Sequence, residues 1–273
     1  MRECGSQVVA FKPGDRIYFR APRTRMGSFA ECVDIHQQFA APLPDSWSMQ
    51  DAASLPLVAL ATIQGFRDRA SAQPGQSILI HAGSGGLGSF AIQYAKRVLH
   101  LQVTTTTSSR NHDWVQQLGA DHVIAYDQSN YLQCGQRFDL VFDTLGPPHT
   151  ARSFEVVKPG GAVVSVMGPP DASFAKQVGA GFPMNLVISA ASLPMRFRAH
   201  RAKARYFRYL TESSGTQLRE LNQQLKRGLI QPVIDRVVPL AECPDALDYL
   251  ARGRARGKVV ISIGNAPKRQ HAG

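Results

Sequence analysis

Cysteine is scarce in this chain of 273 residues, which holds four, at positions 4, 32, 134 and 243. Because no two of them form a close-spaced pair, we expect free thiols and a reducing, cytoplasmic location instead of a disulfide framework. Cys32 and His36, four residues apart, are the candidate metal pair. A lone pair does not complete a metal site, so we expect none.

Long apolar runs are also missing. No stretch approaches the roughly 20 residues that a helix needs to span a bilayer, and the first residues, Met1 to Gly5, do not form a secretory signal. The composition, 44% hydrophobic and 19% charged, is that of an ordinary globular protein with room for one large domain or two modest ones. We therefore expect no membrane span.

Acidic residues are too few to balance the basic ones, 20 against 31, which gives a formal net charge of +11. A basic protein can bind nucleic acid, an anionic membrane or a phosphorylated cofactor. Much of the excess lies between Met195 and Arg208. No nucleic-acid-binding motif accompanies this segment, so we interpret it as a solvated helix face and expect no nucleic-acid partner.

A glycine-rich turn joins an apolar run, Ile78 to Ile80, to a segment with helical spacing that starts at Phe90. Gly83, Gly85 and Gly88 fit the pattern G-x-G-x-x-G, which is weak alone but has a mechanism between a strand and a helix. The first glycine permits the tight turn, the second lets backbone approach a pyrophosphate, and the third lets helix and strand pack closely. The pattern predicts a dinucleotide site; the alternative is a turn without a ligand.

No acid stands at the end of the next apolar run, Leu101 to Thr107. A dinucleotide site for NAD usually places Asp or Glu there to hold the ribose 2′-hydroxyl, but the first acid here is Asp113. The end of the run instead offers hydroxyls and a guanidinium, from Ser108, Arg110 and Asn111. These can bind a 2′-phosphate, so we predict NADP(H) over NAD(H). The alternative is that Arg110 is only a solvated residue at the start of a helix.

Strands and helices alternate after Ser77, which predicts an α/β fold with a doubly wound parallel sheet. The expected strands are Ile78–His81, Leu101–Thr106, His122–Ile124, Phe138–Asp143 and Ala162–Val166. The last two run into Leu145-Gly146 and Met167-Gly168. Open parallel sheets bind ligands at such carboxyl ends.

The residues before Ser77 and after Val166 have other sequence patterns. Residues 1 to about 50 predict short strands, at 16–19 and 27–35, and 52–69 predicts a helix kinked near Pro56. Residues 174–208 predict a helical insert with an apolar and a basic half, which can line a pocket or an interface. Helices at 217–226 and 245–251, strands at 233–240 and 258–263, and a disordered tail at 265–273 complete the expected order.

Seven short stretches together resemble the medium-chain dehydrogenase/reductase superfamily, in particular its zinc-independent quinone oxidoreductase-like branch. They are 11–16, 27–31, 51–56, 82–88, 118–121, 158–161 and 257–260. The resemblance implies a Rossmann domain inserted into a partial GroES-like, β-rich catalytic domain. The implied boundaries are 1–53 and 236–264 for the catalytic domain and 54–235 for the Rossmann domain with the insert 174–208. Family members carry further strands ahead of Gly5, so the resemblance implies an N-terminally shortened chain.

The resemblance also implies roles for single residues. Gly85, Gly86 and Leu87 would face the pyrophosphate, and Tyr126 the adenosine. Leu145, Gly146, Met167 and Gly168 would border the ribose and nicotinamide, and Lys258 is similar to a basic position near the cofactor. Leu145 and Met167 are alternatively core residues and Lys258 a solvated one. A four-cysteine lobe is missing after Arg16, and Leu57 stands near a position where zinc-using relatives have a cysteine.

These features together imply an NADPH-dependent oxidoreductase that passes hydride to quinones or α,β-unsaturated carbonyl compounds without zinc, as a homodimer. No general acid can be named, although Tyr18 and Tyr126 are available phenols. One alternative is an NADPH-binding protein without turnover, which meets another macromolecule through the basic segment. A second is zinc-independent oxidoreduction of alcohols or enoyl thioesters.

Overall fold

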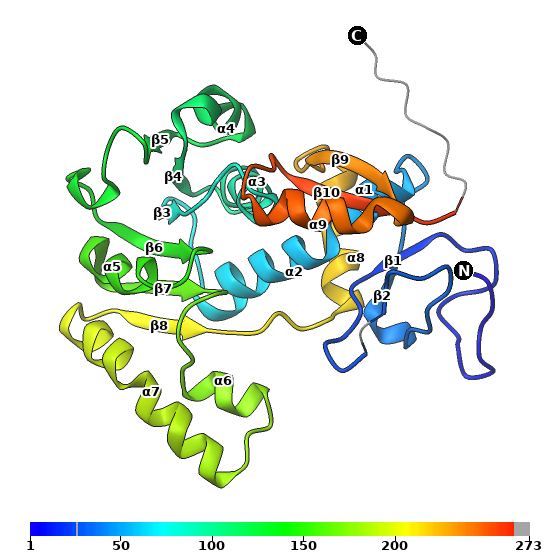
Figure 1. Cartoon of the computed structure of the whole chain (residues 1–273), viewed down its shortest axis with the longest axis horizontal. Coiled ribbons are helices and arrows are strands. Elements are labelled where there is room, and N and C mark those ends of the chain that lie inside the picture. Colours follow the sequence, from blue (N-terminus) through cyan, green and yellow to red (C-terminus); the bar gives the residue numbers. More distant parts are fainter. Residues whose placement is uncertain (26, 265–273) are drawn as a thin grey trace.

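A six-stranded parallel sheet forms one half of the computed structural model, which describes residues 1–25 and 27–264 (left in Figure 1). The strand order is β5-β4-β3-β6-β7-β8, so the sheet starts in the middle at β3 and is wound outward in both directions. The strands are β3 (Ser77–Ile80), β4 (Gln102–Thr107), β5 (His122–Ala125), β6 (Phe138–Asp143), β7 (Val157–Ser165) and β8 (Arg205–Arg208). The doubly wound parallel sheet is confirmed.

Side chains on β3 alternate between the two faces of the sheet because successive residues of a strand point to opposite sides. Ile78 and Ile80 belong to the core cluster that includes α2 (Pro56–Ile63) and α3 (Gly86–Gln93). Leu79 belongs to the cluster on the other face, with residues of α5 (His149–Val156) and α7 (Phe182–Arg201). Both faces are therefore covered by helices.

Helix starts and ends follow their local sequence signals. Ser48 and Asp51 form a capping box at the start of α1 (Met49–Ser54), and Pro56 begins α2, which confirms the predicted break. Gly119 ends α4 (His112–Leu118) with a φ of 119°. Short helical turns complete the order: η1 (Gln37–Phe39), η2 (Gln64–Arg69), η3 (Tyr94–Val98), η4 (Ser109–Asn111), η5 (Tyr131–Gln133) and η6 (Leu240–Glu242).

A second group of elements lies beside the sheet. It contains an antiparallel pair, β1 (Ile17–Phe19) and β2 (Ala40–Pro42), and a parallel pair, β9 (Ile234–Pro239) and β10 (Lys258–Ser262). Helices α8 (Gly215–Lys226) and α9 (Cys243–Ala251) pack nearby. The Tyr18 hydroxyl lies 2.8 Å from both the Leu218 carbonyl oxygen and Asn222 Oδ1, which ties β1 to α8.

The strand predicted at 27–35 is wrong: these residues are mostly exposed and form no strand in the described chain. Their alternation of apolar and polar residues therefore has no neighbouring strand to pair with. The predicted division into an interrupted catalytic domain and a Rossmann domain stays a prediction. The predicted disordered tail, 265–273, lies outside the described residues.

The insert 174–208 is helical only in part. It contains α6 (Ala172–Gln177), which starts just before the insert, and α7. Helix α7 ends at Arg201, with Ala202 as its C-cap, and Lys203 takes a φ of 51°. The next residues pair with β7 as β8, because Tyr206 and Phe207 favour a strand once the helix has ended. The helical interpretation of 205–208 is therefore wrong. Among the described residues, no helix is both long and apolar enough to cross a membrane.

Candidate functional site

The sheet reverses its winding direction between β3 and β6, which are hydrogen-bonded neighbours. At such a point the loops after the two strands diverge and leave a crevice at their carboxyl ends, where doubly wound sheets bind ligands. The loop after β3 carries the predicted glycines, and the loops after β6 and β7 carry Leu145-Gly146 and Met167-Gly168. The fold thus brings the three predicted segments to one edge.

Two glycines of the first loop are required by close packing. A Cβ on Gly83 would overlap the Thr105 hydroxyl of β4, and one on Gly88 would overlap the Ala82 carbonyl oxygen. Gly85 caps α3 in an extended conformation and offers no side-chain acceptor to the first turn of the helix. The first N–H groups of α3 therefore have no side-chain cap, and the helix dipole adds partial positive charge. Leu87 is half-buried against the core.

The start of β10 covers this loop from the other side. The Gly257 N–H donates to the Ser84 carbonyl oxygen at 3.2 Å, and Gly85 and Gly257 form an isolated parallel bridge. Lys258 Cδ lies 2.5 Å from where a Gly86 Cβ would stand, so Gly86 leaves room for the lysine stem. Burial lowers the pKa of the Lys258 amine. A lysine held in this way carries a charge that a bound anion would stabilise.

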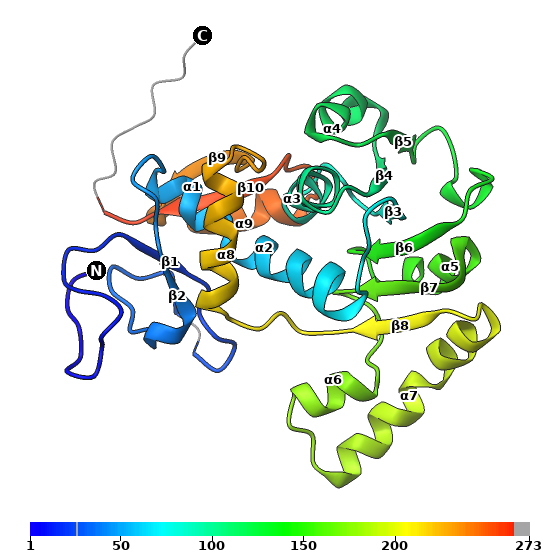
Figure 2. The ribbon, with the colours of Figure 1, turned by 180° about the vertical axis from the view of Figure 1, so that it is seen from behind.

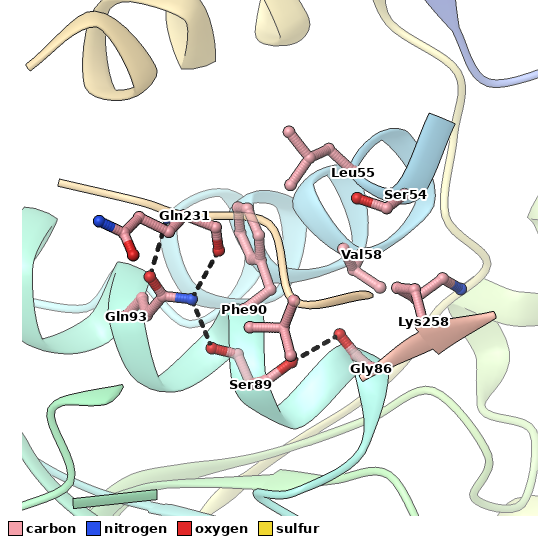
Figure 3. Close-up of a pocket in the computed structure, with 10 residues that line it drawn as sticks. Ser54, Leu55, Val58, Gly86, Ser89, Phe90, Gln93, Gln231 and Lys258 are labelled. Atoms are coloured by element: carbon pink, nitrogen blue, oxygen red, sulfur yellow. Dashed lines mark hydrogen bonds between the residues drawn. The ribbon is translucent and has the colours of Figure 1, made fainter. Parts of the chain in front are cut away.

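Behind the loop, a narrow pocket lies between α1, α2 and α3 (Figure 3). Gln93 of α3 closes it by exchanging two hydrogen bonds with the Gln231 backbone, at 3.0 and 2.9 Å. Lys258 lies at its opposite end, next to Gly86. These contacts fix α3 against the chain that leads into β9. We assign the pocket a packing role.

Polar atoms gather at the end of β4. Ser108 and Asn111 are buried, and Asn111 Nδ2 donates to Ser108 Oγ at 3.2 Å. The Asn111 Oδ1 and Thr107 Oγ1 atoms are buried and have no partner. Buried polar atoms normally find one, so an unpaired pair at a strand end indicates a missing ligand or water. Arg110 is exposed beside them, and the Arg256 guanidinium donates to its carbonyl oxygen at 3.4 Å.

An acid that the sequence analysis did not foresee lies at the same place. Asp127 accepts hydrogen bonds from the Ser109 N–H at 2.9 Å and the Ser109 hydroxyl at 2.7 Å. The hydroxyl contact is the main cause that lowers the Asp127 pKa. The signal was that Asp127 follows β5, which pairs with β4. Tyr126, its neighbour, is 65% exposed beside the end of β4.

A buried carboxylate organises the loops on the other side of the crevice. Asp143 Oδ1 accepts from the N–H groups of Leu145 and Gly146, both at 3.0 Å. Its Oδ2 accepts from the hydroxyls of Thr150 and Ser165, and Ser165 Oγ in turn accepts from the N–H groups of Met167 and Gly168. One network therefore holds both predicted segments. The sequence analysis missed Asp143, although it is the last residue of a buried strand.

Leu145 is 44% exposed and Met167 60% exposed, so the alternative that they are core residues is wrong. Gly146 has a φ of 77°, and a Cβ there would lie 2.9 Å from the Met167 carbonyl oxygen. This contact brings the two loops together and turns their apolar side chains outward. A solvent-exposed apolar rim beside a hydrogen-bonded loop suits a flat, weakly polar ligand group.

His81 lies between the β4 side and the β6 side of the crevice and is fully buried directly after β3. Its Nδ1 is 3.3 Å from the Thr106 hydroxyl of β4, and its ring packs edge-on against Tyr131 and near His149. The Nε2 atom has no partner. Burial, opposed by Asp143 and aided by His149, lowers the His81 pKa to about 4, so the ring is neutral at pH 7.

The residues at this edge fit a dinucleotide with a 2′-phosphate, because the unpaired Thr107 hydroxyl, the exposed Arg110 and an uncapped helix start lie along it. Within 1–25 and 27–264, no three His, Cys, Asp or Glu side chains gather as ligands. Cys32 is exposed beside Arg2, and His36 Nδ1 accepts from the Gln38 N–H.

The chain is similar to known dehydrogenases and reductases. A family model described as zinc-binding dehydrogenase matches residues 118–261. The chain is 33% identical to the 2-methylene-furan-3-one reductase of Solanum lycopersicum, over 94% of this chain and 60% of that protein. It is 30% identical to the chloroplastic NADPH-dependent alkenal/one oxidoreductase of Arabidopsis thaliana, again over 94% of this chain and 60% of that protein. The chain thus spans about three fifths of the length of these curated relatives.

Among solved structures, the quinone oxidoreductase from Coxiella burnetii superposes with a TM-score of 0.82 at 28% sequence identity. The match covers 96% of this chain and 76% of that one. The likeness therefore includes the elements beside the sheet as well as the sheet itself.

Proposed function

The chain belongs to the zinc-binding dehydrogenase family, that of the medium-chain dehydrogenases and reductases, and from this premise we propose that it is an NADPH-dependent oxidoreductase. Its acceptors are quinones or α,β-unsaturated carbonyl compounds. The names of its relatives, an alkenal/one oxidoreductase, a furanone reductase and a quinone oxidoreductase, support this substrate class.

The polar atoms at the end of β4 support NADPH as the cofactor in preference to NADH. The Thr107 and Ser108 hydroxyls can donate to a phosphate, Arg110 offers an exposed guanidinium, and the unpaired Asn111 Oδ1 can accept from a ribose hydroxyl. Asp127 is turned toward Ser109 and is held there by two hydrogen bonds. Arg110, which also attracts the Asp127 carboxylate, and the Thr107 and Ser108 hydroxyls are the groups that a phosphate would contact. A charge-assisted hydrogen bond to the phosphate is worth roughly 1.5–3 kcal/mol.

Bound NADPH supplies the hydride, and the residues of this chain bind and orient it. The loop Gly83–Gly88 and the start of α3 would hold the pyrophosphate, with Lys258 beside it, and Tyr126 would border the adenosine. Asp143 fixes the backbone of Leu145-Gly146 and Met167-Gly168, which would border the nicotinamide ribose. Leu145 and Met167 would shield the reacting face from water once the cofactor and acceptor are bound. The proposed hydride transfer does not involve a zinc ion.

Steady-state oxidation of NADPH with a panel of quinones, enones, enoyl thioesters and aldehydes tests the proposal. We expect turnover with quinones or enones. Turnover with enoyl thioesters or aldehydes alone supports the second substrate class. Folded protein that binds NADPH but reduces no acceptor is a binding protein without turnover, and the enzyme proposal is then wrong.

Three further properties are part of the proposal. The chain forms a homodimer, which light scattering tests; β8 pairs with β7 along one side and with no described strand along the other. It works in the cytoplasm, in keeping with four free cysteines in the described chain, and localisation of a tagged chain tests this. Segments 1–53 and 236–264 form one domain around the Rossmann domain 54–235, which limited proteolysis tests.

A further inference from the structure

Helix α7 has two apolar rows on opposite sides. The inner row, Ile188, Ser192, Met195 and Ala199, is buried, and Met195 and Ala199 join the core cluster beneath the sheet. Their spacing of four, three and four residues keeps them on one side of a helix. This row accounts for the attachment of α7 to the body.

The outer row consists of Phe182, Leu186, Ala190, Leu193 and Phe197, all of which are exposed. Their spacing of four, four, three and four residues also keeps them on one side, about 150° from the inner row at about 100° per residue. Phe182 is 80% exposed and Phe197 66%. The row runs roughly 22 Å along the helix at 1.5 Å per residue, and no core in the described chain accounts for it.

Charge on this helix has one sign. No Asp or Glu occurs between Asp171 and Glu212. Arg196, Arg198 and Arg201 are exposed in the last turns of α7 and lie on both sides of the outer row. A shallow hollow there is lined by Leu193, Pro194, Phe197, Arg198 and Arg201. Apolar and cationic groups thus share one surface, without an acid to neutralise them.

We propose that α7 docks this protein onto an anionic membrane surface. The outer row lies in the plane of the interface, and its arginines contact lipid phosphates. Exposed aromatic and aliphatic residues flanked by Arg are the composition of interfacial helices, and anionic lipid attracts juxtaposed cations. The basic half is therefore a contact surface and not only a solvated face.

Three observations favour a membrane over a second copy of the chain. A second α7 brings no carboxylate to pair with the arginines. The whole chain is strongly basic, with a formal net charge of +11, which assists approach to an anionic surface. Figures 1 and 2 show α6 and α7 at one corner of the molecule, where α7 extends away from the sheet and is free to meet a flat surface.

Co-sedimentation of the full chain with sucrose-loaded vesicles tests the proposal without any cofactor, so its outcome is independent of the enzyme proposal. The vesicles are phosphatidylcholine alone or phosphatidylcholine with phosphatidylserine. We expect binding to the anionic vesicles at least tenfold stronger than to the neutral ones, weakening as salt is raised.

Two variants divide the surface into its parts. Leu193→Glu with Phe197→Glu removes the apolar contact, and Arg196→Gln, Arg198→Gln and Arg201→Gln together remove the charge. Each is expected to lower anionic binding at least tenfold. The matched controls make the same changes elsewhere: Leu247→Glu with Leu250→Glu on α9, and Arg227, Arg252 and Arg254, all exposed, to Gln. The controls are expected to change binding less than threefold.

Circular dichroism confirms that each variant is folded before it is scored. Absence of vesicle binding by the folded wild type overturns the proposal, as does binding that the α7 variants leave unchanged or that the controls reduce equally. If light scattering shows a dimer that Leu193→Glu with Phe197→Glu converts to a monomer, and vesicles do not bind, the outer row is an interface between copies and the proposal is wrong.

Discussion

Beside β4 the crevice leaves oxygens of Thr107 and Asn111 without protein partners, whereas beside β6 both oxygens of Asp143 are fully engaged by the chain itself. The first half keeps its hydrogen-bonding capacity for a ligand. The second uses that capacity to fix its own backbone and presents Leu145 and Met167 instead. A ligand that is charged at one end and aromatic at the other meets a suitable surface at each end.

Replacing Gly88, which packs the glycine loop against its neighbours, should have the largest effect on stability and on NADPH binding. In Gly88→Ala the new Cβ meets the Ala82 carbonyl oxygen and lies 2.7 Å from Gly83 Cα, so backbone must move. We expect the free energy of unfolding to fall by about 3 kcal/mol and NADPH binding to be lost. Urea unfolding and a fluorescence titration measure both. Gly5→Ala, with nothing within 4 Å, is the control; equal behaviour of the two variants contradicts the packing role.

Asp143→Asn tests the second half. An amide cannot accept from four donors, so we expect a loss of about 2–3 kcal/mol in the free energy of unfolding and weaker NADPH binding. Asp139→Asn is the control, at the opposite end of the same strand, where Asp139 pairs with Ser77 and Lys158. It should lower stability but leave the NADPH affinity of folded protein unchanged. An unchanged affinity in Asp143→Asn as well would show that the loops need no carboxylate.

His81 lies between the β4 side and the β6 side of the crevice, and its protonation makes the stability of the fold depend on pH. Its pKa is about 4 in the folded protein, below the ordinary 6.5, because it is buried. The unfolded chain then binds more protons between these values, so stability falls as pH is lowered from 6.5 toward 4. From pH 7.5 to 5 the loss should be about 2 kcal/mol. Urea unfolding across this range measures it. His81→Phe should remove this part of the slope, and an unchanged slope rejects the assignment.

The smallest effect should come from the exposed end of the first half. Arg110→Ala removes a cation beside the predicted 2′-phosphate position. NADPH should lose about tenfold in affinity, equivalent to about 1.4 kcal/mol, while NADH should change little. Parallel fluorescence titrations with the two nucleotides measure this. Arg137→Ala is the control, because Arg137 is exposed and directly precedes β6, at the amino end of the parallel strands. Equal losses for both nucleotides would assign Arg110 a structural role.

The first half could be predicted from the sequence because its requirements are local. Gly83, Gly85 and Gly88 stand within one turn, and Ser108 to Asn111 follow a strand directly. The absence of an acid was also visible, but only along the chain. Asp127 reaches Ser109 across the pairing of β4 with β5, and no spacing rule places it there.

The second half could be located but not explained. Leu145-Gly146 and Met167-Gly168 were recognised as strand ends, yet their order depends on contacts among Asp143, Thr150 and Ser165, which lie on three elements. The strand predicted at 27–35 and the helix predicted through 208 failed for a related reason. Alternation and charge describe a segment, but the availability of a pairing partner, such as β7 for β8, decides its conformation.

The bridge between Gly85 and Gly257 also sets an order of events during synthesis. The glycine loop leaves the ribosome early, and its neighbours β3, β4 and α3 can assemble soon afterwards. Its cover at Gly257 and Lys258 is translated well after these elements. The nascent chain therefore carries an uncovered glycine loop until this segment arrives, and only then does the crevice acquire its final shape.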